Sequence, residues 1–302
     1  MKRSAMLAQA VRRLQAAGVE GAARDARLLL RHAAGLGAAE LTARLAEEAD
    51  GAECRRFADA IAARCRRQPV SQILGRRAFF GREFRVTPDV LDPRPESETL
   101  IETALARGPA ARILDLGTGS GALMLTLLAE WPEARGLGID ASPAALAVAR
   151  ENARALGLEA RAELRQGDWL DGVKGRFDLV ICNPPYIAEA ELEGLAPELR
   201  DWEPRIALSP GGDGLDVYRL LSNTLWLHIS ADGAALFEIG YGQASEVRKI
   251  FTNSRLFVSN LIPDMNGVPR CVIVQRRHSI GKNPPKGLES AKLGLSSPQH
   301  RV

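Results

Sequence analysis

The sequence predicts a doubly wound α/β sheet preceded by a small bundle of short helices. From about residue 95 onward, apolar runs of strand length alternate with helical stretches, and two of these runs end in loops typical of ligand-binding sites. Before that point, residues 1–67 are rich in Ala, Leu and Arg and contain no good strand. The chain has 302 residues, 46% of them hydrophobic, which is enough for one large core and one small one.

The first part of the chain carries apolar residues at helical spacing. They are Leu7, Ala10, Val11 and Leu14, followed by Phe57, Ile61 and Cys65. We therefore expect a helical bundle over residues 1–75, with these apolar stripes forming its core. Apolar pairs on either side of Gly81 then predict a hairpin, and prolines continue it as a linker, so that residues 76–95 connect two domains.

The second domain is expected over residues 96–276. Its predicted strands are 112–116, 135–139, 161–165, 177–182, 233–239, 256–262 and 270–275. Helical stretches between most of them favour a parallel sheet, but the last two strands lack a crossover helix and must be antiparallel. Residues 277–302 are basic with few large apolar residues, and we expect a disordered tail there.

The strand at 177–182 ends abruptly in Asn183-Pro184-Pro185-Tyr186. Because proline lacks an N–H and restricts the residue before it, Asn183 is held extended at the carboxyl end of the strand. Its amide oxygen and the carbonyl of Pro184 can then form a clamp of two acceptors for an NH2 group on a planar substrate. An ordinary strand-to-loop turn is the alternative interpretation, and it would be preferred for a bare Asn-Pro.

A glycine-rich turn follows the strand at 112–116. Its residues of interest are Asp115, Gly117, Thr118, Gly119, Ser120 and Gly121. The first two glycines allow positive φ and close approach of a ligand, and Gly121 allows the next helix to pack tightly on the strand. The carboxylate before the turn suits a cofactor with an ammonium group better than a pyrophosphate. Asp140, after the next strand, is the candidate for ribose hydroxyls, although it could instead cap a helix that Ser142 is also able to cap.

Together with Gly167-Asp168-Trp169, these motifs resemble class I S-adenosylmethionine methyltransferases that act on planar nitrogens. Further segments make the resemblance specific to the PrmC/HemK family, and it extends to about Gln275. These segments are 69–75, 79–81, 90–98, 183–187, 203–208 and 212–216. Asp92 and Ser97 depart from the family pattern, which usually has an apolar residue and Thr at these positions.

The resemblance implies a Rossmann-like sheet with an antiparallel last strand and S-adenosyl-L-methionine as cofactor. It also implies methylation of the glutamine side-chain nitrogen in the Gly-Gly-Gln loop of class I peptide-chain release factors, with the bundle recognising that protein. The predicted catalytic residues are Asn183, Pro184, Pro185 and Tyr186. The predicted cofactor-binding residues are Asp115, Gly117, Thr118, Gly119, Ser120, Gly121, Asp140, Asp168, Trp169 and Asn183.

Several of these roles have a plainer alternative. Asp168 is expected to accept from the adenine amino group, while Trp169 stacks on the ring or only fills the core. Tyr186 packs against the substrate or cofactor, or only lines the wall. For the clamp itself, attack by an amide nitrogen builds positive charge there, so acceptors around it stabilise the transition state. The methylated nitrogen is strongly acidic, and no general base is needed.

Composition narrows the class of protein. The net charge is +3, and four cysteines and four histidines lack the spacing of a disulfide framework or a metal site, so no metal is expected. No apolar run approaches membrane-spanning length, and residues 1–18 lack a signal-peptide core. We expect a cytoplasmic monomer, with a mitochondrial presequence as the alternative.

Two rival functions stay open. One is N-methylation of an exocyclic amine of DNA or RNA, although the sequence has neither a strongly basic balance nor aromatic residues interleaved with basic ones. We therefore expect no direct requirement for nucleic acid. The other is a non-catalytic scaffold with the same fold.

Overall fold

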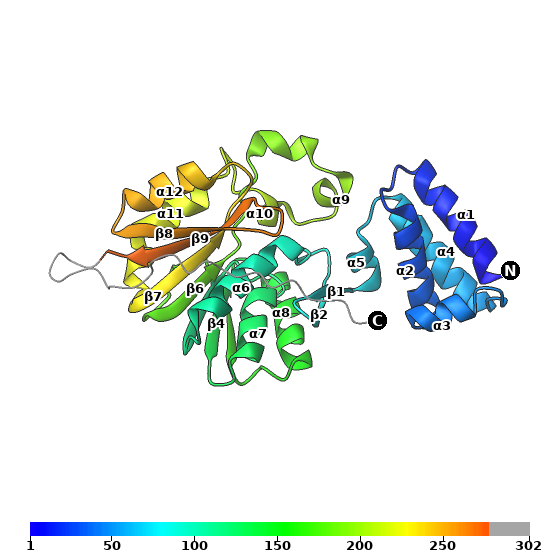
Figure 1. Ribbon diagram of the computed structural model, residues 1–302, viewed down its shortest axis with the longest axis horizontal. Coiled ribbons are helices and arrows are strands. Elements are labelled where there is room, and N and C mark those ends of the chain that lie inside the picture. Colours follow the sequence, from blue (N-terminus) through cyan, green and yellow to red (C-terminus); the bar gives the residue numbers. More distant parts are fainter. Residues whose placement is uncertain (278–302) are drawn as a thin grey trace.

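Residues 1–277, which the computed structural model describes, form a helical bundle, a hairpin and a seven-stranded sheet with helices on both faces (Figure 1). Apart from Arg277, the tail expected over 277–302 lies outside the described residues.

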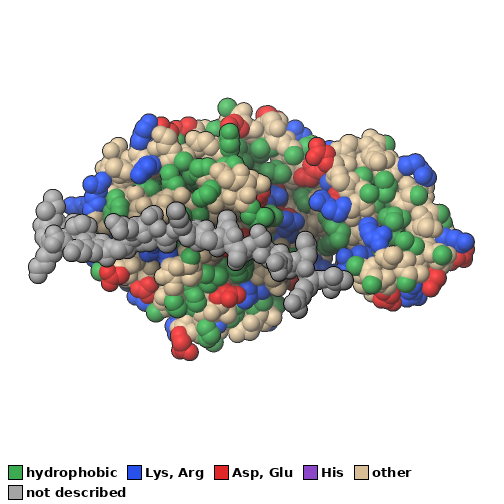
Figure 2. Space-filling view, in the orientation of Figure 1, with side chains coloured by type: hydrophobic (Ala, Val, Ile, Leu, Met, Phe, Trp, Pro, Cys, Tyr) green, Lys and Arg blue, Asp and Glu red, His purple; other side chains and the backbone are tan. Residues whose placement is uncertain are grey.

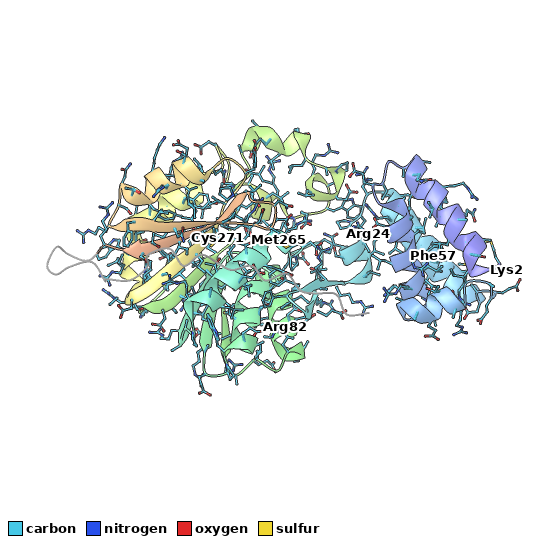
Figure 3. The ribbon with its side chains drawn as sticks, in the orientation of Figure 1. Lys2, Arg24, Phe57, Arg82, Met265 and Cys271 are labelled. Carbon is cyan, nitrogen blue, oxygen red and sulfur yellow. The ribbon has the colours of Figure 1, made fainter. Side chains whose placement is uncertain are left out.

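Short helices build the bundle. They are α1 (Arg3–Ala16), α2 (Ala22–Ala34), α3 (Ala38–Ala43), α4 (Gly51–Cys65) and α5 (Val70–Leu74). Their buried side chains form a core of their own, and Phe57 lies inside it (Figure 3). A buried ion pair also joins α1 to α4, since Arg3 donates two hydrogen bonds of 2.7 Å to Glu53. The helical spacing of the apolar residues is confirmed.

The hairpin consists of β1 (Arg76–Phe79) and β2 (Arg82–Arg85), paired antiparallel. Its turn contains Gly81 with positive φ, as a tight hairpin turn requires. Two contacts hold it against the larger domain. Arg82 pairs with Glu130 of α7 (Ala122–Glu130) at 2.6 Å, and Asn152 of α8 (Pro143–Ala155) bonds both the amide and the carbonyl of Arg85. Asn152 thereby fixes the end of β2, from which the linker begins.

The strands of the sheet follow the order β5-β4-β3-β6-β7-β9-β8. They are β3 (Arg112–Leu116), β4 (Arg135–Asp140), β5 (Ala162–Gln166), β6 (Phe177–Cys182), β7 (Ile229–Glu238), β8 (Leu256–Pro263) and β9 (Pro269–Arg276). The strands β3 to β7 are parallel, and β9 is antiparallel to both neighbours, which confirms the predicted arrangement. β7 begins at Ile229 instead of 233, because Ile229 pairs with Phe177 before a bulge whose polar residues interrupt the apolar run.

Helices cover both faces of this sheet (Figure 1). They are η1 (Pro95–Ser97), α6 (Glu98–Arg107), α7 (Ala122–Glu130), α8 (Pro143–Ala155), η2 (Glu189–Gly194), α9 (Pro197–Arg200), α10 (Arg205–Leu208), α11 (Asp216–Thr224), η3 (Leu225–Leu227) and α12 (Ala244–Thr252). The helices α6 and α7 pack on one face, and α11 and α12 pack on the other. Alternation along β3 serves both cores, with Ile113 on the first face and Leu114 on the second.

The strand order reverses between β3 and β6. From β3 the chain continues through β4 and β5 on one side, and β6 and β7 lie on the other. Leu116 at the end of β3 pairs with Cys182 at the end of β6, so the residues that follow these strands face the same crevice. Open α/β sheets bind ligands at such a point.

The bundle is attached to the segment that follows β6. Glu198 of α9 accepts two hydrogen bonds of 2.7 Å from Arg67 and forms an ion pair with Arg64 at 2.9 Å. Trp202 donates its ring N–H to the carbonyl of Arg66, and its own carbonyl accepts from Gln72. Figure 2 shows acidic and basic side chains gathered at the junction of the two parts.

We predict that Gly214→Ala destabilises the protein by about 2 to 4 kcal/mol, because the new Cβ adds left-handed strain to a steric clash. Gly214 has a φ of +80°, and its Cβ would lie 2.3 Å from the backbone oxygen of Tyr186. Urea unfolding measures the change. Gly194→Ala is the matched control, since a Cβ there has nothing within 4 Å. Equal stability of the two variants would contradict the prediction.

Candidate active site

A cavity of about 500 Å³ opens at the crevice where the strand order reverses. Its walls come from the glycine turn, the ends of β4 and β6, the linker before α6 and residues 204–210. The predicted site residues in this lining are Gly117, Thr118, Gly119, Ser120, Asp140, Asp168, Trp169, Asn183 and Pro185. Four other predicted residues do not line it, namely Asp115, Gly121, Pro184 and Tyr186.

The glycine turn presents open backbone to the cavity. The amides of Gly117 and Thr118 both donate to the carbonyl of Ile139, each at 2.9 Å, which ties the turn to β4. Gly119 has a φ of +55°, and a Cβ there would meet only a backbone oxygen at 4.0 Å. The space in front of Gly119 is therefore free for a ligand.

Gly121 packs differently from the prediction. A Cβ at this position would lie 2.8 Å from Leu125 in the next turn of α7 and 3.4 Å from Ala149 of α8. The close approach it permits is thus between two helices and not between a helix and its strand. Its φ of +80° also makes it the left-handed residue that starts α7.

Asp115 lies beneath the turn and is only 1% exposed. One carboxylate oxygen accepts a hydrogen bond of 2.6 Å from the hydroxyl of Thr118, and the other has no protein partner within the described residues. Burial raises the pKa of Asp115 to about 7. The carboxylate therefore supports the turn from behind, and its predicted contact with the cofactor stays a prediction.

Asp140 stands on the cavity wall at the end of β4. Its Oδ2 accepts from the amide of Gly119 at 2.8 Å, and its Oδ1 accepts from the amide of Ser142 at 2.9 Å. The cap of α8 is Ser142, whose hydroxyl oxygen accepts from Ala145. Asp140 is therefore not the helix cap, and each of its oxygens keeps acceptor capacity for a ligand.

Asp168 and Trp169 line the cavity beside Asp140, because the preceding Gly167 donates its amide to the carbonyl of Asp140 at 3.1 Å. Trp169 has a positive φ of 50°, which is uncommon outside glycine, and a Cβ on Gly117 would lie 3.6 Å from its ring. The ring lines the cavity and also packs partly on the core, and its predicted stacking on the adenine stays a prediction. The carboxylate of Asp168 is exposed and makes no hydrogen bond or ion pair within residues 1–277, so it is a free acceptor.

Asn183 is linked to two residues that the sequence prediction missed. Its Nδ2 donates to the hydroxyl oxygen of Ser97 at 3.1 Å, and that hydroxyl donates to Oε2 of Glu238 at 2.5 Å. Burial raises the pKa of Glu238 to about 6. A carboxylate ending an apolar strand was the signal that could have identified Glu238, whereas Ser97 lies within a segment already noted for its resemblance.

Tyr186 faces away from the cavity. Its hydroxyl donates to Oε1 of Glu238 at 3.2 Å, and its ring packs partly on the core beside β6. This geometry favours plain packing of Tyr186 over contact with the substrate. Pro184 is buried, yet no donor reaches its carbonyl within the described residues.

The departure at Asp92 is accommodated by polar partners. Asp92 is 4% exposed and accepts from the hydroxyl of Ser71 on α5 at 2.8 Å. Its backbone amide donates to Glu203, which also pairs with Arg94 at 2.9 Å. Burial raises the pKa of Glu203 to about 7. Asp92 thus joins the bundle to the linker and to the segment after β6.

Within residues 1–277, no cluster of His, Cys, Asp or Glu side chains has the arrangement needed to hold a metal ion. The helices of the same residues include none with the length and apolar character of a membrane span.

Comparison with known proteins identifies the family. Residues 91–212 match the family described as methyltransferase small domain, and residues 5–75 match the PrmC N-terminal domain. A release factor glutamine methyltransferase of Cereibacter sphaeroides is 52% identical over 272 residues, covering 90% of this chain and 98% of the relative. The chain belongs to the release factor glutamine methyltransferase family. Another of these methyltransferases, from Rhodospirillum rubrum, is 44% identical over 275 residues, covering 90% of this chain and 84% of the relative.

A solved structure shows the same fold. The methyltransferase from Pyrococcus furiosus aligns with a TM-score of 0.50 at 18% identity, covering 65% of this chain and 89% of that one. The sheet of this methyltransferase family member therefore has the class I arrangement that the sequence predicted.

The cofactor of this methyltransferase is S-adenosylmethionine, and the residues present fit it. The open backbone at Gly119 can receive its amino acid portion, and the acceptors of Asp140 and Asp168 match hydroxyl and amino groups. Trp169 offers a ring face at the same wall. When bound, the cofactor supplies an electrophilic methyl group on a sulfonium.

We predict that Asp140→Ala weakens binding of S-adenosylmethionine by about 1.5 to 3 kcal/mol, the scale of losing a charged acceptor. Isothermal titration calorimetry measures the affinity. Asp232→Ala removes an exposed carboxylate that does not line the cavity and should leave binding unchanged. Unchanged affinity in Asp140→Ala would limit Asp140 to supporting the glycine turn.

A second prediction concerns pH. The folded pKa of Asp115, about 7, lies above the unfolded value, so the folded protein keeps a proton that the unfolded chain has lost. Raising the pH from 4 to 8 therefore lowers the contribution of Asp115 to the free energy of unfolding. Asp115→Asn removes this dependence. The free energy of unfolding of the variant, relative to that of wild type, should therefore rise by roughly 2 to 4 kcal/mol between pH 4 and pH 8.

Urea unfolding of the cofactor-free protein at both pH values measures this difference. The exposed Asp171→Asn is the control, and its curve should follow that of wild type. Parallel curves for wild type and Asp115→Asn would contradict the raised pKa of Asp115.

Proposed function

We propose that this methyltransferase transfers a methyl group from S-adenosylmethionine to the side-chain amide nitrogen of the glutamine in the Gly-Gly-Gln loop of peptide-chain release factors. The observation that carries the proposal is the pair of acceptors at the end of β6. Asn183 directs its NH2 toward Ser97, which leaves its oxygen free, and the adjacent Pro184 carbonyl has no protein donor within residues 1–277. The relatives named as release factor glutamine methyltransferases support the same substrate.

These two acceptors suit an amide nucleophile. The nitrogen lone pair of a glutamine amide is delocalised into its carbonyl, and attack on the methyl group builds positive charge on the nitrogen. Hydrogen bonds from its two N–H groups to Asn183 and Pro184 would turn the lone pair toward the methyl group and stabilise that charge. The nitrogen then loses one proton, and its acidity makes a strong base unnecessary.

We further propose that residues 1–75 recognise the release factor, that residues 76–95 link them to the enzyme, and that residues 96–276 carry the chemistry. The bundle has a separate core. It contacts Glu198 and Trp202 in the same segment whose residues 204–210 border the cavity. A protein bound to the bundle would therefore lie next to the entrance of the cavity. Because the proposed substrate acts in translation, we propose that the enzyme is cytoplasmic. We also propose that it is a monomer and that it does not require nucleic acid.

We predict that Asn183→Ala lowers kcat by roughly 10² to 10³, because one of two preorganised acceptors is lost where charge develops. Mass spectrometry of purified release factor, incubated with enzyme and cofactor, should detect one added methyl group on the loop glutamine. Asn223→Ala on the exposed side of α11 is the matched control and should keep full activity.

Two comparisons test the substrate itself. A release factor with glutamate in place of the loop glutamine offers no N–H to the acceptors and should stay unmethylated. Single-stranded DNA and RNA test the exocyclic-amine alternative. Faster methylation of a nucleic-acid amine, or near wild-type turnover by Asn183→Ala, would overturn the proposed function.

A further inference from the structure

Three polar side chains from distant parts of the chain form a line that leads from the cavity wall into the protein. Asn183 follows β6, Ser97 ends η1 and Glu238 ends β7. The Nδ2 of Asn183 lies 3.1 Å from Oγ of Ser97, and this Oγ lies 2.5 Å from Oε2 of Glu238. Ser97 and Glu238 are only 3% and 1% exposed, so water does not compete for these bonds.

The donors and acceptors in this line permit one consistent arrangement. An ionised carboxylate only accepts, so the single hydroxyl proton of Ser97 is committed to Glu238. The Ser97 oxygen can then only accept, and it must receive the NH2 of Asn183. A reversed Asn183 amide would oppose two oxygens at Ser97 with no proton between them, and it would turn its own donors toward a substrate NH2.

We propose that Ser97, anchored by Glu238, is a positioning residue that holds the amide of Asn183 with its oxygen available to the substrate nitrogen. The inference rests on the proposed function, because only a substrate that offers N–H groups needs an acceptor there. Neither Ser97 nor Glu238 takes part in the chemical step. Ser97 acts through Asn183, and its hydroxyl is the only feature that this role requires.

The anchor is itself fixed from several sides. The second oxygen of Glu238 accepts from the hydroxyl of Tyr186 at 3.2 Å, and the backbone carbonyl of Glu238 accepts from Tyr218 at 2.7 Å. Ser97 is also the N-cap residue of α6, and apolar side chains of this helix lie in the core on the first face of the sheet. The orientation of one amide is thereby tied to β7 through Glu238 and to α6 through Ser97.

A matched pair of variants tests the role of the hydroxyl. Ser97→Thr and Ser97→Val introduce side chains of nearly equal size, and only threonine keeps a hydroxyl. We expect Ser97→Thr to retain kcat within about threefold, while Ser97→Val loses roughly 10- to 100-fold in kcat on release factor. KM for release factor and Kd for S-adenosylmethionine should change less than about threefold in both. Ser97→Ala, which adds no bulk, repeats the test if valine prevents folding.

A double-mutant comparison separates positioning from a general structural role. If Ser97 acts only through Asn183, adding Ser97→Val to Asn183→Ala should cause no further loss of kcat. A loss in that background equal to the loss in wild type would overturn the inference, and so would equal kcat for the threonine and valine variants. If the wild type methylates release factor and Ser97→Val does so with the same kcat, only this inference is overturned. A wild type that leaves release factor unmethylated overturns the proposed function and the inference with it.

Discussion

The parallel register of β3 and β6 is the constraint on which the site depends. Leu116 pairs with Cys182, so the glycine turn after β3 and Asn183 after β6 begin side by side although they are distant in sequence. Because the strand order reverses here, no crossover helix fills the space above the two strand ends. The methyl donor and the nucleophile can meet only where both strand ends border one cavity.

The carboxylates on the cavity wall differ in environment from those behind it. Asp140 and Asp168 present acceptors to the ligand side. Asp115 and Glu238 are almost completely buried, and burial raises the pKa of both. These buried carboxylates bond to hydroxyls of the protein, at Thr118 in the first case, and so hold the backbone and side chains that the ligand meets. These two carboxylates therefore help to fix the shape of the cavity wall.

The segment after β6 couples the bundle to this chemistry. It leaves the sheet at Asn183, contacts α4 through Glu198 and α5 through Trp202, and returns along the cavity wall. Asp92 adds a second route through Ser71 and Glu203. A protein substrate held by the bundle would therefore press on the same segment that borders its own glutamine.

Local patterns determined the strands, the turns and the side chains that end them, because alternation, glycine and proline act through a few neighbouring residues. The positions of the glycine turn, Asp140 and Asn183 were predictable for this reason. Only the tertiary structure decided which distant groups meet. Ser97 bonds Asn183 across 86 positions and Glu238 across 141, and Tyr186 turns toward Glu238 instead of the cavity. A local sequence pattern does not determine which distant side chain a residue contacts, because that contact depends on how the whole sheet and its helices pack.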